Sequence, residues 1–295
     1  MGNLYVVATP IGNLSDMTQR AVETLKEVDY ILCEDTRNSI KLLNYFDIKN
    51  KLVSYHKFNE QEKVESIIKD LKEGKNIALI SDAGTPCIND PGEYIVKKAR
   101  EEHIPVFGIG GISASITALS ISGLDTKTFT YYGFFPREKK EQEELIENIN
   151  NSDIKTFIFY ESPKRIIKTI EFLAKELPDL KISVSKELTK LHEKNFYGNI
   201  TEVLKEIKQD DKTSIGEYTF IIEKEEKIKK QEQNISIEAQ LIDLIIKNNI
   251  TIKEAVDLLN KENKNLSKKE IYNVSLNLKS ILKSQNWQII LSMLQ

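Results

Sequence analysis

The chain has 295 residues, of which 40% are hydrophobic, so it is long enough to fill the cores of two domains. Its net charge of -3 neither requires nor forbids a polyanionic partner. The two cysteines, Cys33 and Cys87, are far apart and the three histidines lack metal-ligand spacing, so we expect neither a disulfide framework nor a bound metal. A strand pattern starts almost at the N-terminus and no run of 18 apolar residues occurs, so we expect a reduced, soluble, cytoplasmic protein with no membrane segment.

Short apolar runs alternate with helical patterns along residues 1–123, which predicts a parallel sheet with helices between its strands. Asp16 and Gln19 have the spacing of a capping box, which predicts a helix that continues to Glu27. Further helices are expected over 93–102 and in the small-residue segment that ends at Ser122. The expected strands cover residues 4–8, 30–33, 52–55, 76–80 and 105–107.

The stretch from Ser81 to Gly92 joins the strand at 76–80 to the next helix and holds two glycines, two prolines and two carboxylates. Glycine permits a positive φ and proline fixes φ, so such a composition specifies one tight loop. Its carboxylates, Asp82 and Asp90, should lie at the carboxyl edge of the sheet. Open α/β sheets bind their ligands at that edge.

Two other loops at this edge are also built from small residues. Residues 9–16, Thr-Pro-Ile-Gly-Asn-Leu-Ser-Asp, form a strand-to-helix turn that is neither a dinucleotide fingerprint nor a Walker loop. Residues 108–115 bring three glycines to a helix N-terminus, where a ligand can lie against the backbone. An ordinary βα turn and tight helix packing are the respective alternatives.

Polar groups follow two more of the expected strands. Glu34, Asp35 and Arg37 come after the strand at 30–33, and His56 comes after the strand at 52–55. Such groups are suited to holding a hydroxyl or a cation. A solvated turn with a local ion pair, and a loop histidine, are the simpler explanations.

The chain changes character from Thr128, where an aromatic strand over 128–135 is expected. Polar clusters at 160–165 and 186–190 follow two of the later strands. We therefore expect a second α/β domain whose functional edge faces the first domain across a cleft. Its three further strands are expected over residues 156–160, 181–185 and 218–222.

The end of the chain should be a helical appendage. A charged run at 223–233 is typical of a linker, and helices are expected over 235–248, 252–263 and 268–283. The boxes Thr251-x-x-Glu254 and Ser267-x-x-Glu270 open the last two helices. A phosphate backbone is one candidate partner of the lysines there, and a solvated lysine-rich face is the alternative. These lysines are Lys264, Lys268, Lys269, Lys279 and Lys283.

The predicted fold class is therefore α/β, in three parts. Residues 1–123 form an N-terminal α/β domain, 124–224 a C-terminal α/β domain, and 225–295 a linker with the helical appendage.

Several long motifs stand in the order seen in one protein family. They are Thr9-Pro10-Ile11-Gly12-Asn13-Leu14, Glu34-Asp35-Thr36-Arg37, His56 with Asn59 and Glu60, the whole loop Ser81–Gly92, Phe159-Tyr160-Glu161-Ser162, and Glu187-Leu188-Thr189-Lys190 with Glu193. From about Leu4 to Ile222 the chain resembles the small-subunit ribosomal RNA methyltransferases of the tetrapyrrole methylase fold. Its first loop is Thr-Pro-Ile-Gly-Asn-Leu rather than Gly-x-Gly-Pro-Gly-Asp, which points away from the porphyrinoid-modifying relatives.

This resemblance implies methyl transfer from S-adenosyl-L-methionine to the 2′-hydroxyl of a cytidine ribose in 16S ribosomal RNA. It also implies a cofactor folded between the two domains. The family usually has Pro-Gly-Pro where this chain has Gly110-Gly111-Ile112, so we expect a looser loop there. The cofactor-binding residues implied are Pro10, Ile11, Gly12, Asp82, Thr85, Ser113, Ala114, Glu161 and Leu188.

Methyl transfer to a ribose hydroxyl requires an in-line approach and a group that takes the proton. The candidates are Glu34, Asp35, Glu161, Lys186 and Glu187. We favour Asp35 and Glu187 as base or orienting group, with Arg37 holding a phosphate. The expected substrate-binding residues are Arg37, His56, Asn59, Lys164, Arg165 and Lys190.

The expected partner is small-subunit ribosomal RNA or the 30S particle, and the resemblance also implies a homodimer. Two other functions stay open from the residues. One is a methyltransferase that acts on a tetrapyrrole or corrinoid, and the other is a non-catalytic RNA-binding protein.

Overall fold

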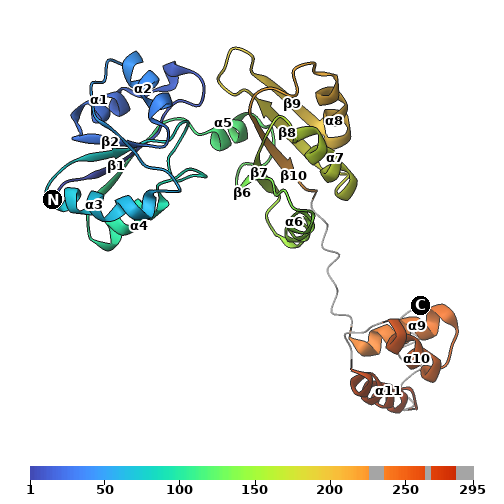
Figure 1. The fold of residues 1–295 in the computed structure, drawn as a ribbon. Coiled ribbons are helices and arrows are strands. Elements are labelled where there is room, and N and C mark those ends of the chain that lie inside the picture. Colours follow the sequence, from blue (N-terminus) through green and yellow to red (C-terminus); the bar gives the residue numbers. More distant parts are fainter. Residues whose placement is uncertain (226–235, 263–266, 284–295) are drawn as a thin grey trace. The chain divides into compact units, whose positions relative to one another are not determined.

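The computed structural model describes residues 1–225, 236–262 and 267–283. The chain divides into two compact units, Met1–Glu225 and Glu226–Gln295 (Figure 1). The larger unit contains two five-stranded sheets. The predicted division of this unit into domains at residue 123 stays a prediction.

The first sheet is entirely parallel, with strand order β3-β2-β4-β1-β5. Helices connect its strands, as the alternating pattern of the sequence predicts. We call this sheet and α1–α4 the first lobe. Its elements are β1 (Leu4–Val7), η1 (Leu14–Asp16), α1 (Gln19–Glu27), β2 (Tyr30–Cys33), α2 (Thr36–Tyr45), β3 (Leu52–Ser54), α3 (Glu60–Lys72), β4 (Ile77–Leu79), α4 (Glu93–Glu101) and β5 (Val106–Ile109).

Helices cover both faces of this sheet because alternate residues of its buried strands point to opposite sides. Leu32 and Leu79 pack with apolar residues of α3 and α4. Ile31 and Ala78, their neighbours along the strands, pack with residues of α1 and α2. All strand C-termini then lie at one edge, which is where the small-residue loops emerge.

The second sheet is mixed, with order β6-β7-β10-β8-β9. Only β6 and β7 run parallel, and the other neighbours are antiparallel. We call this sheet and α5–α8 the second lobe. Its elements are α5 (Ala114–Ile121), β6 (Phe129–Phe134), α6 (Lys139–Asn151), β7 (Thr156–Glu161), α7 (Ile166–Glu176), β8 (Lys181–Lys186), β9 (Lys194–Asn199), α8 (Ile200–Gln209) and β10 (Tyr218–Glu223).

Different helices cover the two faces of the second sheet. Phe157 and Phe220 pack with residues of α6, α7 and α8 in the larger core. Ile158 and Ile221 face the other way and pack with Ala118 of α5 and with Leu188. Helix α5 therefore continues the chain from the first sheet and covers the second.

Two sequence predictions about these lobes are wrong. The N-cap of α1 is Thr18, whose hydroxyl accepts a hydrogen bond from the amide of Ala21, whereas Asp16 belongs to the preceding 3-10 turn. The edge strand β9 was also not expected. Three of its six residues are exposed, and Phe196 is its one side chain that packs against the core, so the strand has no apolar run.

The smaller unit contains α9 (Ile237–Asn248), α10 (Ile252–Glu262) and α11 (Lys268–Lys283), close to the expected ranges. Leu241, Ala255 and Ile271 contribute one residue from each helix to its core. The capping box of α10 is present, because the amide of Thr251 donates to Glu254 Oε2 and the amide of Glu254 donates to Thr251 Oγ1. Most of the expected linker, residues 226–233, lies outside the described residues.

Candidate active site

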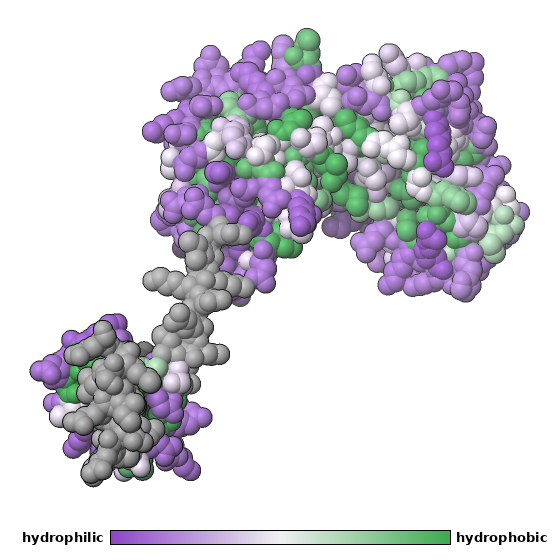
Figure 2. Space-filling model, turned by 180° about the vertical axis from the view of Figure 1, so that it is seen from behind, coloured by the Kyte–Doolittle hydropathy of each residue, from purple (hydrophilic) through white to green (hydrophobic). Residues whose placement is uncertain are grey.

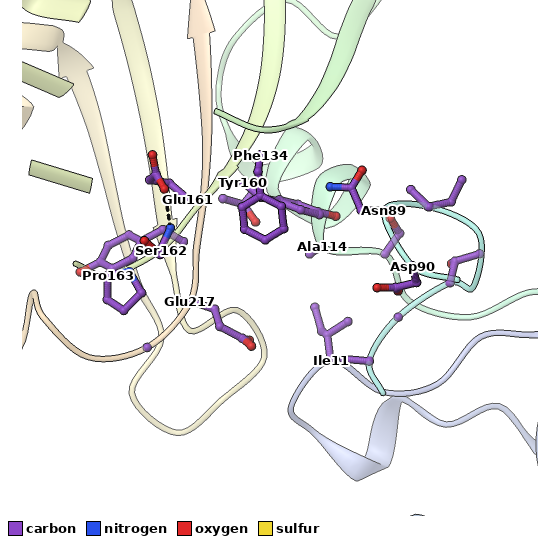
Figure 3. Close-up of a pocket in the computed structure, with 18 residues that line it drawn as sticks. Ile11, Asn89, Asp90, Ala114, Phe134, Tyr160, Glu161, Ser162, Pro163 and Glu217 are labelled. Carbon is purple, nitrogen blue, oxygen red and sulfur yellow. Dashed lines mark hydrogen bonds between the residues drawn. The ribbon is translucent and has the colours of Figure 1, made fainter. Parts of the chain in front are cut away.

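A cavity of about 370 Å³ lies between the two lobes of the larger unit (Figure 3). The first lobe contributes the loops after β1 and β4, and the second lobe contributes the ends of β6, β7 and the segment before β10. The five predicted cofactor residues that line it are Ile11, Thr85, Ser113, Ala114 and Glu161. The cavity therefore lies where the sequence predicts the small-residue loops.

Backbone hydrogen bonds hold the two loops of the first lobe together. The amide of Thr9 donates to the carbonyl of Gly84 at 2.8 Å, and the amide of Gly84 donates back to Thr9 at 3.0 Å. Gly84, Cys87 and Asn89 all have a positive φ, between 68° and 78°. Such conformations are rare outside glycine and concentrate at functional sites. The loop is thus held in one shape that exposes its main chain.

Asp90 is the carboxylate that this loop places in the cavity (Figure 3). Burial raises its pKa to about 6, and the negative charges of Glu34 and Asp82 act in the same direction, against a hydrogen bond from Ser81. The side chain makes no ion pair with a lysine or arginine in the described part of the chain. The surroundings of Asp90 in the first-lobe wall therefore disfavour its charged form.

The side chain of Glu161 in the second-lobe wall is fully buried, and both of its carboxylate oxygens have partners. Its carboxylate accepts hydrogen bonds from the hydroxyl of Thr169 at 2.6 Å and the amide of Ser162 at 2.7 Å. It also pairs with Arg165, at 3.1 Å. Arg165 in turn donates to the carbonyls of Phe135 and Pro136. The predicted cofactor residue Glu161 and the predicted substrate residue Arg165 thus form one bonded group.

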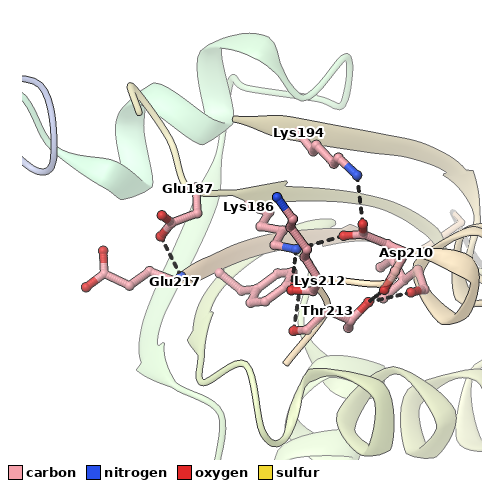
Figure 4. Close-up of polar contacts among 9 residues, drawn as sticks. Lys186, Glu187, Lys194, Asp210, Lys212, Thr213 and Glu217 are labelled. Atoms are coloured by element: carbon pink, nitrogen blue, oxygen red, sulfur yellow. Dashed lines mark hydrogen bonds and ion pairs between the residues drawn. The ribbon is translucent and has the colours of Figure 1, made fainter. Parts of the chain in front are cut away.

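Lys190 contacts two carboxylates at the rim of the second-lobe wall. Its Nζ atom lies 2.7 Å from Glu187 Oε1 and 3.0 Å from Glu217 Oε2. Glu187 Oε1 also accepts the amide of Glu217 at 3.0 Å (Figure 4). The aliphatic part of Lys190 covers Gly12 of the first lobe, where a Cβ atom would lie 2.5 Å from Lys190 Cγ. Glu187 therefore holds Lys190 and the backbone of Glu217 through one carboxylate oxygen.

Lys186 lies in a buried polar network outside this cavity (Figure 4). Its Nζ atom is 2.7 Å from Asp210 Oδ2 and 2.6 Å from the carbonyl oxygen of Lys212. Lys194 contacts the other carboxylate oxygen of Asp210 at 2.7 Å. Hydrogen bonds from Lys186 and then Lys194 lower the pKa of Asp210 to about 2. Lys186 is thus committed as a donor to this network.

A separate cavity of about 430 Å³ in the first lobe is lined by Glu34, Asp35, Arg37, His56 and Asp82, among others. The guanidinium of Arg37 is 2.7 Å from Asp35 Oδ2, and its hydrogen bond lowers the pKa of Asp35 to about 2. Burial and then the charge of Asp82 raise the pKa of Glu34. A carboxylate held by arginine is a weak base at neutral pH, so Asp35 is better suited to orienting Arg37.

Two of the remaining predicted site residues, Asp82 and Asn59, make hydrogen bonds within the loops of the first lobe. Asp82 accepts hydrogen bonds from the amide of Asp35 and the side chain of Asn38, outside the main cavity. Asn59 accepts the amide of His56 and contacts its ring nitrogen. The predicted site residues that do not line the main cavity are Pro10, Gly12, Asp82, Leu188, Glu34, Asp35, Lys186, Glu187, Arg37, His56, Asn59, Lys164, Arg165 and Lys190.

Several lining residues were not assigned from the sequence. Phe134, Tyr160 and Glu217 reach the cavity from three separate segments of the second lobe. The sequence identifies Asp90 as a loop carboxylate and assigns it no role. The position of Asp90 in that loop was a usable signal, whereas the approach of Glu217 depends on how β10 pairs with its neighbours.

The comparisons with known proteins agree with this architecture. A model of the family "Tetrapyrrole (Corrin/Porphyrin) Methylases" matches residues 3–204. Proteins named "Ribosomal RNA small subunit methyltransferase I" are 42% identical in Halalkalibacterium halodurans and 41% in Bacillus subtilis (strain 168), over 92% of this chain and 94% and 93% of theirs. The chain belongs to this family of tetrapyrrole methylases.

Solved structures share the fold at low sequence identity. Diphthine synthase has a TM-score of 0.58 and 12% identity, covering 76% of this chain and 90% of its own. A uroporphyrin-III C-methyltransferase from Thermus thermophilus, complexed with S-adenyl homocysteine, has a TM-score of 0.51 and 15% identity, covering 75% and 97%. The predicted α/β tetrapyrrole methylase fold and methyltransferase class are confirmed, and the ligand of the Thermus protein is in keeping with the predicted cofactor, S-adenosyl-L-methionine.

The residues of the cavity fit that cofactor. The volume falls in the range of small-molecule pockets, and small side chains leave the backbone of the first-lobe loops accessible. Asp90, Glu161 and Glu217 line the same space, and Asp90, which makes no ion pair in the described part of the chain, favours a ligand that carries positive charge. The described residues contain no group of three metal-ligating side chains, and none of their helices combines the length and apolar character needed to cross a bilayer.

Proposed function

We propose that this protein methylates the 2′-hydroxyl of a cytidine ribose in 16S ribosomal RNA, using S-adenosyl-L-methionine. Family membership at above 40% identity over 92% of the chain carries the proposal. The lining of the cavity agrees with it, because charged and aromatic groups lie beside a wall of small residues. We propose the same set of cofactor residues as above, with Ile11, Thr85, Ser113 and Ala114 making the closest approach.

The cofactor supplies an electrophilic methyl group when it is bound. The protein's task is to hold the ribose hydroxyl in line with that methyl group and to accept the hydroxyl proton. Asp35 orients Arg37, whose guanidinium is largely exposed and is suited to a phosphate of the RNA. Glu187 orients Lys190 at the rim of the cavity.

Phe134 offers a contact for an RNA base beside the cavity. It lies 60% exposed at the end of β6 and packs edge-on against Tyr160, with ring centroids 5.8 Å apart. Sequence-specific RNA recognition commonly stacks an unpaired base on such a ring. We therefore propose that the target cytidine or its neighbour stacks on Phe134.

The smaller unit is the proposed second RNA contact. Lys268, Lys269 and Lys279 are exposed on α11, and Tyr272 is 58% exposed between them. Lysines with an aromatic ring suit a phosphate backbone with an unstacked base. Replacing Lys268 and Lys269 by alanine should weaken RNA binding several-fold and flatten its salt dependence, measured by filter binding at several salt concentrations. Unchanged affinity would contradict this contact. Lys264 and the side chain of Lys283 lie outside the described residues.

We also propose a cytoplasmic homodimer. Hydrophobic residues gather near the middle of the larger unit on the face in Figure 2. Helix α5 exposes Ile116 and Ile121, and the edge strands β5 and β6 expose Phe107 and Phe129. Apolar groups exposed together are typical of an interface. Sedimentation equilibrium at micromolar concentration should give twice the mass of the chain.

The decisive experiment supplies methyl-labelled cofactor to the full-length protein with 30S particles, and separately with naked 16S RNA, from cells that lack the enzyme. We expect label in a 2′-O-methylcytidine, identified by nuclease digestion and mass spectrometry. Label in a corrinoid alone would indicate a small-molecule methyltransferase. Absence of cofactor binding in calorimetry would indicate a non-catalytic RNA-binding protein.

A further inference from the structure

The first-lobe cavity of about 430 Å³ adjoins the main cavity through a shared loop. It is lined by residues that follow β2 and β3 and by Asp82 of the loop after β4. Ala83 and Gly84, the next residues of that loop, line the main cavity. An RNA strand that places one ribose in the main cavity therefore has the first-lobe cavity beside it for a neighbouring nucleotide.

Phe58 supplies an aromatic face to the first-lobe cavity. Its side chain is 95% exposed and packs edge-on against His56, with ring centroids 6.1 Å apart. The turn that carries it is held in shape, because the amide of His56 donates to Asn59 Oδ1 at 2.8 Å and the amide of Asn59 donates to the carbonyl of His56 at 2.9 Å. Most of the ring is therefore available to a nucleobase, which stacks readily on such a face.

Arg37 uses one edge of its guanidinium within the protein and leaves the other edge available. Its Nε and Nη2 atoms donate to the carboxylate of Asp35, at 3.1 and 2.7 Å. Its Nη1 atom makes no hydrogen bond in the described part of the chain, and the side chain is 86% exposed. A guanidinium fixed in this way presents its remaining donors in a set direction, which suits a phosphate.

Glu34 is the carboxylate of this cavity whose oxygens are unused. Asp35 is paired with Arg37, and Asp82 accepts hydrogen bonds from the amide of Asp35 and the side chain of Asn38. Glu34 is half-buried, and its carboxylate makes no hydrogen bond or ion pair among the described residues. Half-burial removes water from the carboxylate, so a ligand that donates hydrogen bonds to it compensates for that loss.

A free carboxylate beside a stacking face distinguishes between the four bases. Guanine places its N1–H and its 2-amino group side by side, so it can donate to both oxygens at once. In adenine and cytosine the amino group lies beside an unprotonated ring nitrogen, and in uracil the N3–H lies between two carbonyl oxygens. Each of these three bases therefore brings an acceptor against the carboxylate, and guanine is the base that fits.

We propose that the first-lobe cavity binds a guanine that is the immediate neighbour of the methylated cytidine in the RNA. Glu34 accepts from the Watson–Crick edge of this guanine, Phe58 stacks on its ring, and Arg37 contacts its phosphate. The inference rests on the function proposed above and adds a residue that reads sequence. Glu34 is then a determinant of specificity and not the proton acceptor, in keeping with its position outside the main cavity.

The test uses the full-length protein, labelled S-adenosyl-L-methionine and 30S particles reassembled from 16S RNA. Inosine, which lacks the 2-amino group, replaces the guanine beside the methylated cytidine. The wild-type kcat/KM should fall about tenfold, because one hydrogen bond to a carboxylate is lost. Glu34→Gln should lower kcat/KM for the guanine RNA by a similar factor, mainly through KM, and should distinguish guanine from inosine by less than about threefold. RNA with 7-deazaguanine, whose Watson–Crick edge is intact, should be methylated like the unmodified RNA.

Binding without the cofactor gives a second readout. Phe58→Ala should weaken the affinity for the same RNA about tenfold in filter binding, because it removes the stacking face. Glu62→Gln and Tyr45→Ala are the matched controls, since Glu62 is an exposed carboxylate on α3, Tyr45 is an exposed aromatic residue on α2, and neither lines the cavity. Calorimetry should give the wild-type cofactor Kd for all of these variants.

Equal kcat/KM values of the wild type for guanine and inosine would overturn this inference and leave the proposed methyl transfer intact. A methylated cytidine with no guanine beside it would do the same. So would a Glu34→Gln variant that loses rate and keeps the full preference for guanine, because Glu34 would then act in the chemical step. A wild-type protein that binds the cofactor but methylates no RNA would overturn the proposed function itself, and this inference with it.

Discussion

The two lobes treat their buried carboxylates in opposite ways. In the second lobe Asp210 is held by Lys186 and Lys194, and its pKa is lowered to about 2. In the first lobe Asp90 makes no ion pair within the described part of the chain, and burial raises its pKa to about 6. The first arrangement stabilises the fold and leaves the carboxylate inert. The second lowers stability and leaves the carboxylate without a cationic partner among the described residues, as expected at sites where activity and stability conflict.

The largest effect should come from breaking the second-lobe network. Lys186 and Asp210 side chains are 5% and 7% exposed. Lys186→Met leaves Asp210 with one partner fewer in a buried site, which typically lowers the free energy of unfolding by about 3–5 kcal/mol. Urea unfolding followed by circular dichroism measures the change. The double variant Lys186→Met with Asp210→Leu should regain most of the loss, and a loss below about 1 kcal/mol for the single variant would break the comparison.

In the first lobe, removing the charge of a carboxylate should raise the free energy of unfolding instead of lowering it. The folded-state pKa of Asp90 is raised, so its contribution to stability is intact below the unfolded-state pKa and is lost as the pH rises through about 6. Asp90→Asn should therefore raise the free energy of unfolding by about 1–3 kcal/mol at pH 8 and change it little at pH 3.5. Thermal unfolding at the two pH values measures this. Destabilisation at pH 8 would show that the carboxylate is paired after all.

A smaller effect is expected where the lobes meet. A Cβ atom at Gly12 would collide with Lys190, whose flexible chain must move. Gly12→Ala should weaken cofactor binding about tenfold, or ~1.4 kcal/mol, by displacing Lys190 from Glu187 and Glu217. Calorimetry measures the Kd. Gly108→Ala is the control, because no atom lies within 4 Å of the position where its Cβ would be. Equal affinities for the two variants would contradict the contact.

The smallest effect should come from the exposed rim. Glu217 is 75% exposed, and exposed ion pairs contribute little because water and salt screen them. Glu217→Gln should change the free energy of unfolding by less than about 0.5 kcal/mol in urea at 0.15 M salt. A change as large as that of Lys186→Met would mean that pairing strength does not follow burial in this lobe.

The sequence predicted the parts of the fold that depend on local pattern. Tyr30–Cys33 was predicted residue for residue, because a buried parallel strand is a continuous apolar run. The sequence does not predict β9, because its residues form no apolar run and its pairing with β8 is a tertiary contact. The first-lobe half of the cavity could be read from small residues and a loop rich in glycine and proline.

The sequence alone could not predict which charged side chains form ion pairs with one another. Lys186 and Asp210 are 24 positions apart and meet only after β8 packs beside the loop that follows α8. Glu161 and Arg165 are four positions apart, yet whether a carboxylate binds its neighbour or a ligand depends on burial. The residues that contact the cofactor and the RNA, and the predicted domain boundaries, stay predictions.

Two glycines, one in each lobe, each lie against a side chain of the other lobe. Gly12 of the first lobe lies under Lys190 of the second, and Gly133 of the second lies under Asn89 of the first. A methyl group at either place would push aside the side chain of the other lobe, Lys190 at one position and Asn89 at the other. Combining both substitutions offers a way to loosen the contact between the lobes in two steps, and so to admit bulkier analogues of the methyl donor.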